Sequence, residues 1–404
     1  MKTNFMKVST WAMALCASMA VFTACNDDEN GTTTPPAPSV ENLGGIVTEN
    51  MTLTANTEYK LTSQLQVKAP AVLTIEEGVK ITAADSEDPI YILIEQGAKI
   101  NAVGTVENPI VMTAENKTAG GWGGLHICGY APTNAGSGFS EIGNAAYGGN
   151  DANDNSGVLK YIRLEYTGFA LDDEHESNGI SFYGVGAGTQ VSYVQTYVGA
   201  DDGLEFFGGT VNVDHCVVVD CTDDSFDWTE GWSGTATNLV AYQTDASCDC
   251  LIEADNNGDN FDATPVAHPT LRNLYLVGNG SSENKRGIRL RAGTRANIDG
   301  AKVAGKPNPL TIETTQTDDA LANGTSVLKN VQIAGVLKND VTGGKYLSAN
   351  FLAGQGNAEN AQIATTWDDV AGDLSFAWLN DAWVTAVQPG DCFGFSVCLL
   401  FIGY

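Results

Sequence analysis

One short strand pattern recurs through the middle of the chain and constrains the fold more than any other feature. Each copy alternates an apolar residue with a mostly polar one, as a β-strand with one buried face does. The copies are Ile180–Tyr183, Leu204–Phe207, Phe226–Thr229, Ile252–Asp255 and Ile288–Arg291. Their first residues are 24 (204−180), 22 (226−204), 26 (252−226) and 36 (288−252) positions apart. A period in the low twenties with insertions indicates a solenoid.

Strands repeated at this interval stack in register about 4.8 Å apart, which aligns equivalent side chains in columns. The expected inward column is Ile180, Leu204, Phe226, Ile252 and Ile288. The two expected outward columns are Ser181, Glu205, Asp227, Glu253 and Arg289, and Tyr183, Phe207, Thr229, Asp255 and Arg291. We expect this paired ladder of outward side chains to be the functional site.

The solenoid is expected to begin well before the ladder, and to form one all-β domain. Residues 73–81 and 92–100 each read as strand, acidic corner with glycine, and strand. We therefore predict a right-handed parallel β-helix with long loops over residues 46–361. Residues 362–404 contain Trp367, Trp378 and Trp383, and we expect them to form a cap or tail at the open end of the solenoid.

The start of the chain reads as a targeting segment. Residues 1–24 combine two lysines with an apolar run too short to span a bilayer, and they precede Cys25. This arrangement resembles a bacterial lipoprotein signal, which implies that Cys25 is lipidated, for example with palmitate. The acidic run at residues 26–29 resembles an export signal for the outer face of the outer membrane. Residues 25–45 would then be a polar tether.

The charge balance limits the partners. The chain has 49 Asp and Glu against 20 Lys and Arg, for a formal net charge of −29. Such a charge argues against nucleic acid and favours a cation-rich or neutral ligand, although it also serves solubility at an anionic surface.

A family resemblance follows from several phrases taken together. They are Gly121–Ile127, Tyr147–Asp151, Leu159–Arg163, Asp201–Thr210 and Asp223–Asp227. Together they resemble a group of bacterial surface lipoproteins of unassigned function, related to pectin-lyase-like right-handed parallel β-helices. The resemblance covers about residues 60–335. It is specific for the fold, and it carries no catalytic motif.

The outward carboxylates predict a cation site. Glu205, Asp227 and Glu253 are expected roughly 5 Å apart, where each adjacent pair repels by about 3 kcal/mol at an effective dielectric constant near 20. Water, a shared proton, Arg289 or a bound divalent cation would each relieve this repulsion. We predict Ca²⁺, with a ligand set of Asp202, Asp224, Asp227 and Glu253.

The first functional hypothesis is a surface protein that binds carbohydrate. Tyr183 and Phe207 would offer flat faces to sugar rings, unless a loop such as residues 172–177 covers them. The candidate ligand-binding residues are Tyr183, Glu205, Phe207, Asp227, Glu253, Asp255, Arg289 and Arg291.

Two alternatives remain. In pectate-lyase-like helices, carboxylates on such a sheet hold calcium and an arginine abstracts the proton, so the resemblance also suggests a polysaccharide lyase. A glycoside hydrolase is a further possibility, because adjacent coils give a retaining separation and next-nearest coils an inverting one. The catalytic candidates are Glu205, Asp227, Glu253, Arg289 and Arg291. The second alternative is a non-catalytic accessory protein of an outer-membrane transporter.

Histidine and cysteine add little to either alternative. His126 and His215 lie within strand patterns and are expected to be core or edge residues. Cys128 and Cys216 are expected to be buried thiols, and Cys248 with Cys250 forms only a weak zinc pattern.

Overall fold

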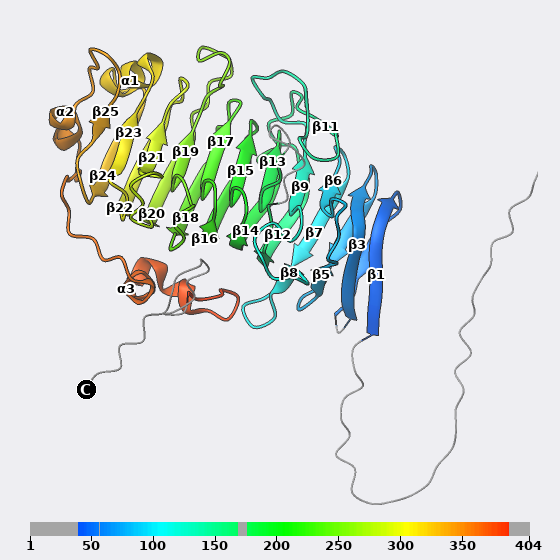
Figure 1. The fold of residues 1–404 in the computed structure, drawn as a ribbon. Helices are drawn as coiled ribbons and strands as arrows, with labels where there is room; N and C mark the ends of the chain where they lie inside the picture. Colours follow the sequence, from blue (N-terminus) through cyan, green and yellow to red (C-terminus); the bar gives the residue numbers. More distant parts are fainter. Residues whose placement is uncertain (1–38, 56, 169–175, 388–404) are drawn as a thin grey trace, which may run out of the picture. The chain divides into compact units, whose positions relative to one another are not determined.

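The chain folds into a stack of parallel strands (Figure 1). The computed structural model describes residues 39–387, apart from residue 56 and residues 169–175. Within these residues, 23 strands belong to one parallel sheet system, and β10 and β11 form a separate antiparallel pair. The predicted right-handed parallel β-helix is confirmed.

The strands are short, as the sequence pattern predicts. They are β1 (Ser39–Val47), β2 (Met51–Leu53), β3 (Thr57–Val67), β4 (Val72–Ile75), β5 (Lys80–Ala83), β6 (Ile92–Ile94), β7 (Lys99–Val103), β8 (Ile110–Ala114), β9 (Leu125–Cys128), β10 (Gly138–Phe139), β11 (Ala146–Tyr147), β12 (Gly157–Glu165), β13 (Ile180–Tyr183), β14 (Gln190–Gly199), β15 (Leu204–Phe207), β16 (Asn212–Cys221), β17 (Phe226–Thr229), β18 (Thr235–Tyr242), β19 (Ile252–Ala254), β20 (Thr270–Val277), β21 (Arg286–Leu290), β22 (Asn297–Ala304), β23 (Asn308–Ile312), β24 (Val327–Ile333) and β25 (Lys338–Asn339). The helices are α1 (Thr315–Ala322), α2 (Ser348–Ala353), α3 (Trp367–Gly372) and the 3₁₀ helix η1 (Leu374–Asn380).

From β13 onward each coil contains one short and one long strand, and like strands pair along the stack. Each long strand bends at an equivalent residue with a positive φ, which most side chains adopt only at a cost. These residues are Tyr161, Tyr193, His215, Asn238, Asn273, Gly300 and Asn330. Contacts along this column offset the cost. The ring of Tyr193 stacks at 4.5 Å on both Tyr161 and His215, and Asn273 Nδ2 donates to Asn238 Oδ1 at 2.6 Å.

The register confirms the predicted columns. Ser181, Glu205, Asp227, Glu253 and Arg289 are consecutive partners along the short strands, and the inward residues from Ile180 to Ile288 are buried. Glycine permits this close approach of coils at Gly203, where a Cβ atom would lie 2.5 Å from the carbonyl oxygen of Ser225. The stack therefore delivers the polar ladder that its sequence period predicts.

The first strand begins earlier than predicted. β1 starts at Ser39, within the segment 25–45 that we expected to be a tether. Only Leu43 and Val47 of this strand are buried, so its sequence lacks the strong alternation that marks the other strands. The predicted signal segment 1–24 and Cys25 lie outside the described residues.

The described part of the predicted cap or tail at residues 362–404 lies along the side of the solenoid rather than over its open end. Residues 363–387, here called the C-terminal strap, pack along the outer face of the long strands (Figure 1). The strap covers an apolar row that includes Tyr197, Val217, Val219, Val240, Tyr242 and Tyr275. Such a row is too large to leave exposed without a partner, which is the physical reason for the strap's position.

The last coil is closed by residues that precede the strap. Phe351 of α2 is fully buried in the main core, and the backbone N–H of Ala358 donates to the carbonyl of Val331 at 2.9 Å. This pairing covers part of the edge of β24 and limits the hazard of an open strand. Among the described residues, no helix is both long and apolar enough to cross a membrane.

The strap gives a direct stability prediction. Trp383 is fully buried and meets Tyr161 and Tyr193 edge to face at 6.1 and 5.9 Å. Trp383→Ala should lower the free energy of unfolding in urea by about 3 to 5 kcal/mol, because it leaves a cavity beneath the strap. The matched change Leu374→Ala removes a side chain that is 93% exposed and should shift the value by less than about 0.5 kcal/mol. Equal effects of the two changes would contradict the packing described here.

Candidate functional site

The candidate site lies where the long strands turn into β15, β17 and β19. Asparagine and aspartate side chains link these turns in a ladder. Asn178 Oδ1 accepts from the N–H of Asp202 at 3.2 Å, and Asp202 Oδ1 accepts from the N–H of Asp224 at 2.8 Å. Asp224 Oδ1 in turn accepts from the N–H of Cys250 at 2.5 Å. Each coil is therefore linked to the next by a hydrogen bond from a backbone N–H to an Asn or Asp side chain. The same side chains bring amide and carboxylate oxygens to the site.

Three carboxylates meet in an inner group formed by Asp202, Glu205 and Asp227. One oxygen from each lies within 4.8 Å of the others. Glu205 Oε2 accepts from Asn178 Nδ2 at 2.5 Å, whereas Asp227 Oδ1 is buried and has no hydrogen-bond partner among the described residues. Burial raises the pKa of all three carboxyls well above the usual range, and the neighbouring acids raise it further.

The next coil neutralises its acids with arginine. Glu253 accepts from Arg289 Nη1 and from Arg291 Nη2, both at 2.5 Å. Arg291 Nε also donates to Asp255 Oδ1 at 2.7 Å, and Arg289 Nε to Glu313 Oε2 at 3.0 Å. The ladder thus contains an acidic part without arginine partners and a part in which acids and arginines are paired.

The pKa of both arginines lies above its usual, already high, value. Burial alone would lower the pKa of Arg289, but the charges of Glu253 and Glu313 raise it by more. The pKa of Arg291 is also raised, because Asp255 and Glu253 offset its burial. Both guanidinium groups therefore stay charged, which is unfavourable for a proton-abstracting base.

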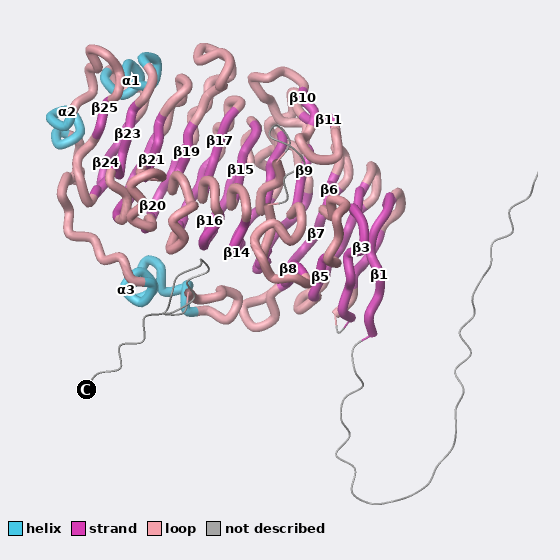
Figure 2. The backbone as a smooth tube through the Cα atoms, in the orientation of Figure 1, coloured by secondary structure: helices cyan, strands magenta, loops and turns pink. Residues whose placement is uncertain are grey.

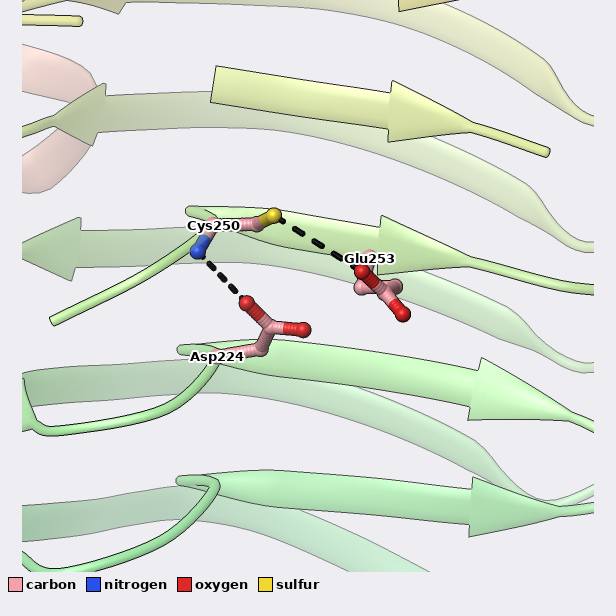
Figure 3. A group of neighbouring side chains, drawn as sticks. All are labelled: Asp224, Cys250 and Glu253. Carbon is pink, nitrogen blue, oxygen red and sulfur yellow. Dashed lines mark hydrogen bonds between the residues drawn. The ribbon is translucent and has the colours of Figure 1, made fainter. Parts of the chain in front are cut away.

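A second group combines Asp224, Cys250 and Glu253 (Figure 3). The thiol of Cys250 points toward Glu253 Oε1 at 3.8 Å, and burial followed by the nearby acids raises the pKa of this thiol. A protonated thiol is a poor metal ligand, and both oxygens of Glu253 are already held by arginine. This group fits a metal ion less well than the inner group does.

The predicted metal ligands are spread over overlapping groups. Asp202 and Asp227 belong to the inner group, and Asp224 and Glu253 belong to the group with Cys250. Asp202 and Asp224 also lie together with Asp223 in a further group. The sequence suggested Glu205 as a ligand-binding residue, and the structure places its carboxylate beside those of Asp202 and Asp227. Asn178 was missed, although an Asn in place of the recurring turn Asp, 24 residues before Asp202 (202−178), was a usable signal.

The expected aromatic platform is not open. Tyr183 and Phe207 stack at 4.4 Å as predicted, but Tyr183 is fully buried and Phe207 is only 7% exposed. Ile142, Ala145 and Tyr147 cover them, from a covering loop of residues 131–150 that carries β10 and β11 (Figure 2). The two rings thus serve packing, because this loop lies over them. The alternative that a loop covers the rings is correct, although the suggested segment 172–177 lies mostly outside the described residues.

The covering loop is tied to the ladder strands by polar contacts. Tyr147 donates its hydroxyl to Glu230 Oε2 at 2.8 Å, and Tyr183 donates to Glu141 Oε2 at 3.3 Å. The acidic side chain of Glu141 therefore comes close to the candidate site, since its charge also raises the pKa of Glu205. Glu141 could not be predicted from the coil spacing, because it lies in an irregular loop.

The remaining histidine and cysteine predictions agree with the structure. His126 is fully buried in the ladder column, donates from Nε2 to the Gly123 carbonyl at 2.7 Å, and has a pKa lowered to about 4 by burial. Its ring is therefore neutral at physiological pH. His215 lies at the bend of β16, and Cys128 and Cys216 are buried free thiols.

The arginine pairs give a second stability prediction. Arg291→Met leaves Glu253 short of one partner and Asp255 without its own, so the free energy of unfolding should fall by about 3 kcal/mol in metal-free buffer. The control Lys338→Met breaks the exposed pair with Asp340, at 2.9 Å, and should cost less than about 1 kcal/mol. If chemical denaturation shows no larger loss for Arg291→Met, the pairing does not stabilise this coil.

Comparison with known proteins places the architecture but not the chemistry. The family described as the pectate-lyase like beta helix domain matches residues 45–383 of the chain. Comparison with the curated proteins and with the solved structures gives no match. The family supports, at most, a role related to carbohydrate, because one fold can carry many functions. With 23 parallel strands in one stack and a match over most of its length, the chain belongs to the pectate-lyase-like β-helix family.

Proposed function

We propose that this protein binds a carbohydrate at the cell surface through a Ca²⁺ ion held by Asp202, Glu205 and Asp227. In this proposal Cys25 carries the lipid anchor, and the anchored protein faces outward from the outer membrane. The strong negative charge of the chain suits such a location, because it keeps the protein soluble beside anionic lipid.

The unpaired oxygen of Asp227 is the observation that carries the proposal. A buried carboxylate oxygen without a partner is costly, and a cation would supply the missing partner. The inner group offers only oxygen atoms, which are the ligands that Ca²⁺ prefers. Among the described residues, no ion pair joins Asp202, Glu205 or Asp227 to a lysine or arginine, in contrast to Glu253.

The partial exposure of Glu205 and Asp227 supports access from outside. Both residues are intermediate in burial, while Asp202 is buried and holds the next turn. Ca²⁺, when bound, would supply coordination positions for the hydroxyl or carboxylate oxygens of a sugar. Arg289 and Arg291 lie one coil beyond Glu253 and add donors for the same ligand on the adjacent surface.

A calcium-dependent lyase is less well supported than binding, while a glycoside hydrolase that uses Glu205 and Asp227 stays an alternative. Arg289 and Arg291 were the candidate bases for a lyase, and both are held in ion pairs that raise their pKa. Among the described residues, neither ladder arginine is free to act as the base, so binding without bond cleavage is better supported than a lyase reaction. An accessory role beside an outer-membrane transporter remains the alternative in which neither a glycan nor Ca²⁺ is the ligand.

Calcium binding is directly measurable. Titration calorimetry with the metal-stripped full chain should show heat on addition of Ca²⁺, and Ca²⁺ should raise the melting temperature. Asp227→Asn keeps the shape of the side chain but removes a charge from the inner group, so it should weaken binding by about tenfold or more. Asp340→Asn changes an exposed carboxylate far from this group in the chain and should leave binding unchanged. Absence of both the heat and the melting shift in the unmodified chain would show that the proposal is wrong.

The ligand class and the chemistry can be separated in one pair of assays. The full chain should be retained by specific polysaccharides on a glycan array with Ca²⁺, and retention should fall after chelation. Under the same conditions, acidic polysaccharides should yield no unsaturated products. Products that disappear in Arg289→Ala would support a lyase instead. If the chain gives neither retention on the array nor unsaturated products, the accessory role is favoured.

A further inference from the structure

A second acidic group lies at the rim of the candidate site, outside the inner group. It consists of Glu176, Asp201 and Asp223, and is here called the rim group. One carboxylate oxygen from each residue lies within 4.8 Å of the others. Asp201 and Asp223 occupy equivalent places in successive turns, 22 residues apart (223−201), and each precedes an aspartate of the turn ladder.

In each Asp-Asp pair, 201–202 and 223–224, hydrogen bonding within the turns explains only the second aspartate. The second member of each pair, Asp202 or Asp224, accepts the N–H of the next turn. Asp201, the first member, is only 6% exposed, and its Oδ2 is buried without a hydrogen-bond partner among the described residues. A buried carboxylate oxygen without a partner is costly, and a bound cation would supply the partner.

The charge count points the same way. Seven carboxylates belong to the inner group, the rim group and the contact between them: Glu176, Asp201, Asp202, Glu205, Asp223, Asp224 and Asp227. The contact is made by Asp202, Asp223 and Asp224, which also lie within 4.8 Å of one another. One divalent ion in the inner group brings two positive charges to these seven acidic groups, while Arg289 and Arg291 are paired elsewhere.

We infer that the rim group holds a second Ca²⁺ ion beside the ion of the inner group. The all-oxygen ligands and the exposure of Glu176 and Asp223 fit a hard cation that keeps some of its water. The inference rests on the proposed function only for the identity of the ion. The rim ion joins two successive turns to Glu176, at the start of the segment that leads into β13.

The number of bound ions tests this inference. Equilibrium dialysis of the metal-stripped full chain against Ca²⁺ should give two ions per chain. Asp201→Asn should lose the ion of the rim group and keep the ion of the inner group. Asp227→Asn should lose the ion of the inner group and keep the ion of the rim group. Asp259→Asn, in the loop between β19 and β20, should still bind two. The circular dichroism spectrum of each variant checks that the β-helix has formed.

A milder variant protects the test against misfolding. Glu176 is exposed, so Glu176→Gln should fold normally and weaken one of the two ions by about tenfold, because the rim group loses one charged ligand. One ion per chain that Asp201→Asn and Glu176→Gln both retain would overturn the rim site and leave the inner site intact. Loss of an ion in Asp201→Asn but not in Asp227→Asn would instead support the rim site and refute the inner one.

Discussion

The in-register stacking of parallel coils is the constraint on which the rest of this structure depends. Each coil must repeat the path of the one before it, so residues such as Gly203 are small where backbones meet. The same repetition places side chains of equivalent positions about 5 Å apart, whatever their charge. Apolar columns gain from this proximity, because they form one continuous core. Acidic columns are penalised by it, and burial together with the neighbouring acids raises the pKa of Glu205 and Asp227.

The regular part of the molecule was predictable from the sequence, and the irregular part was not. Strand alternation together with the coil period defines the neighbours of Asp227 as Glu205 and Glu253, and the register confirms both. The burial of Tyr183 depends instead on the covering loop, whose sequence has no period to align with the coils. The C-terminal strap escaped prediction for a related reason. Its tryptophans showed that it must pack, but an apolar surface exists at the side of a solenoid as well as at its end.

Carboxylates that are neighbours in one column of the site have different surroundings. Glu205, Asp227 and Glu253 occupy one column and have similar side chains, yet only Glu253 meets two guanidinium groups. The column order was enough to predict that Arg289 follows Glu253. It was not enough to predict which oxygen remains without a partner, because this depends on rotamers and on Asn178 in the preceding turn. The cation site therefore stays a proposal that starts from Asp227 rather than from the repeat alone.

The bend in each long strand carries a consequence for how such a chain can change. Tyr193, His215 and Asn238 are chemically different, yet they occupy the same left-handed position and contact one another in sequence. Duplication or deletion of one coil keeps this column of bend residues continuous, provided that a complete coil is gained or lost. Such a duplication or deletion would, however, change the distance between the coil that carries Arg289 and Arg291 and the coils that carry the acids of the inner group. The number of coils between the arginine-bearing coil and the acidic coils can therefore change during evolution, and with it the distribution of surface charge, while the core packing is kept.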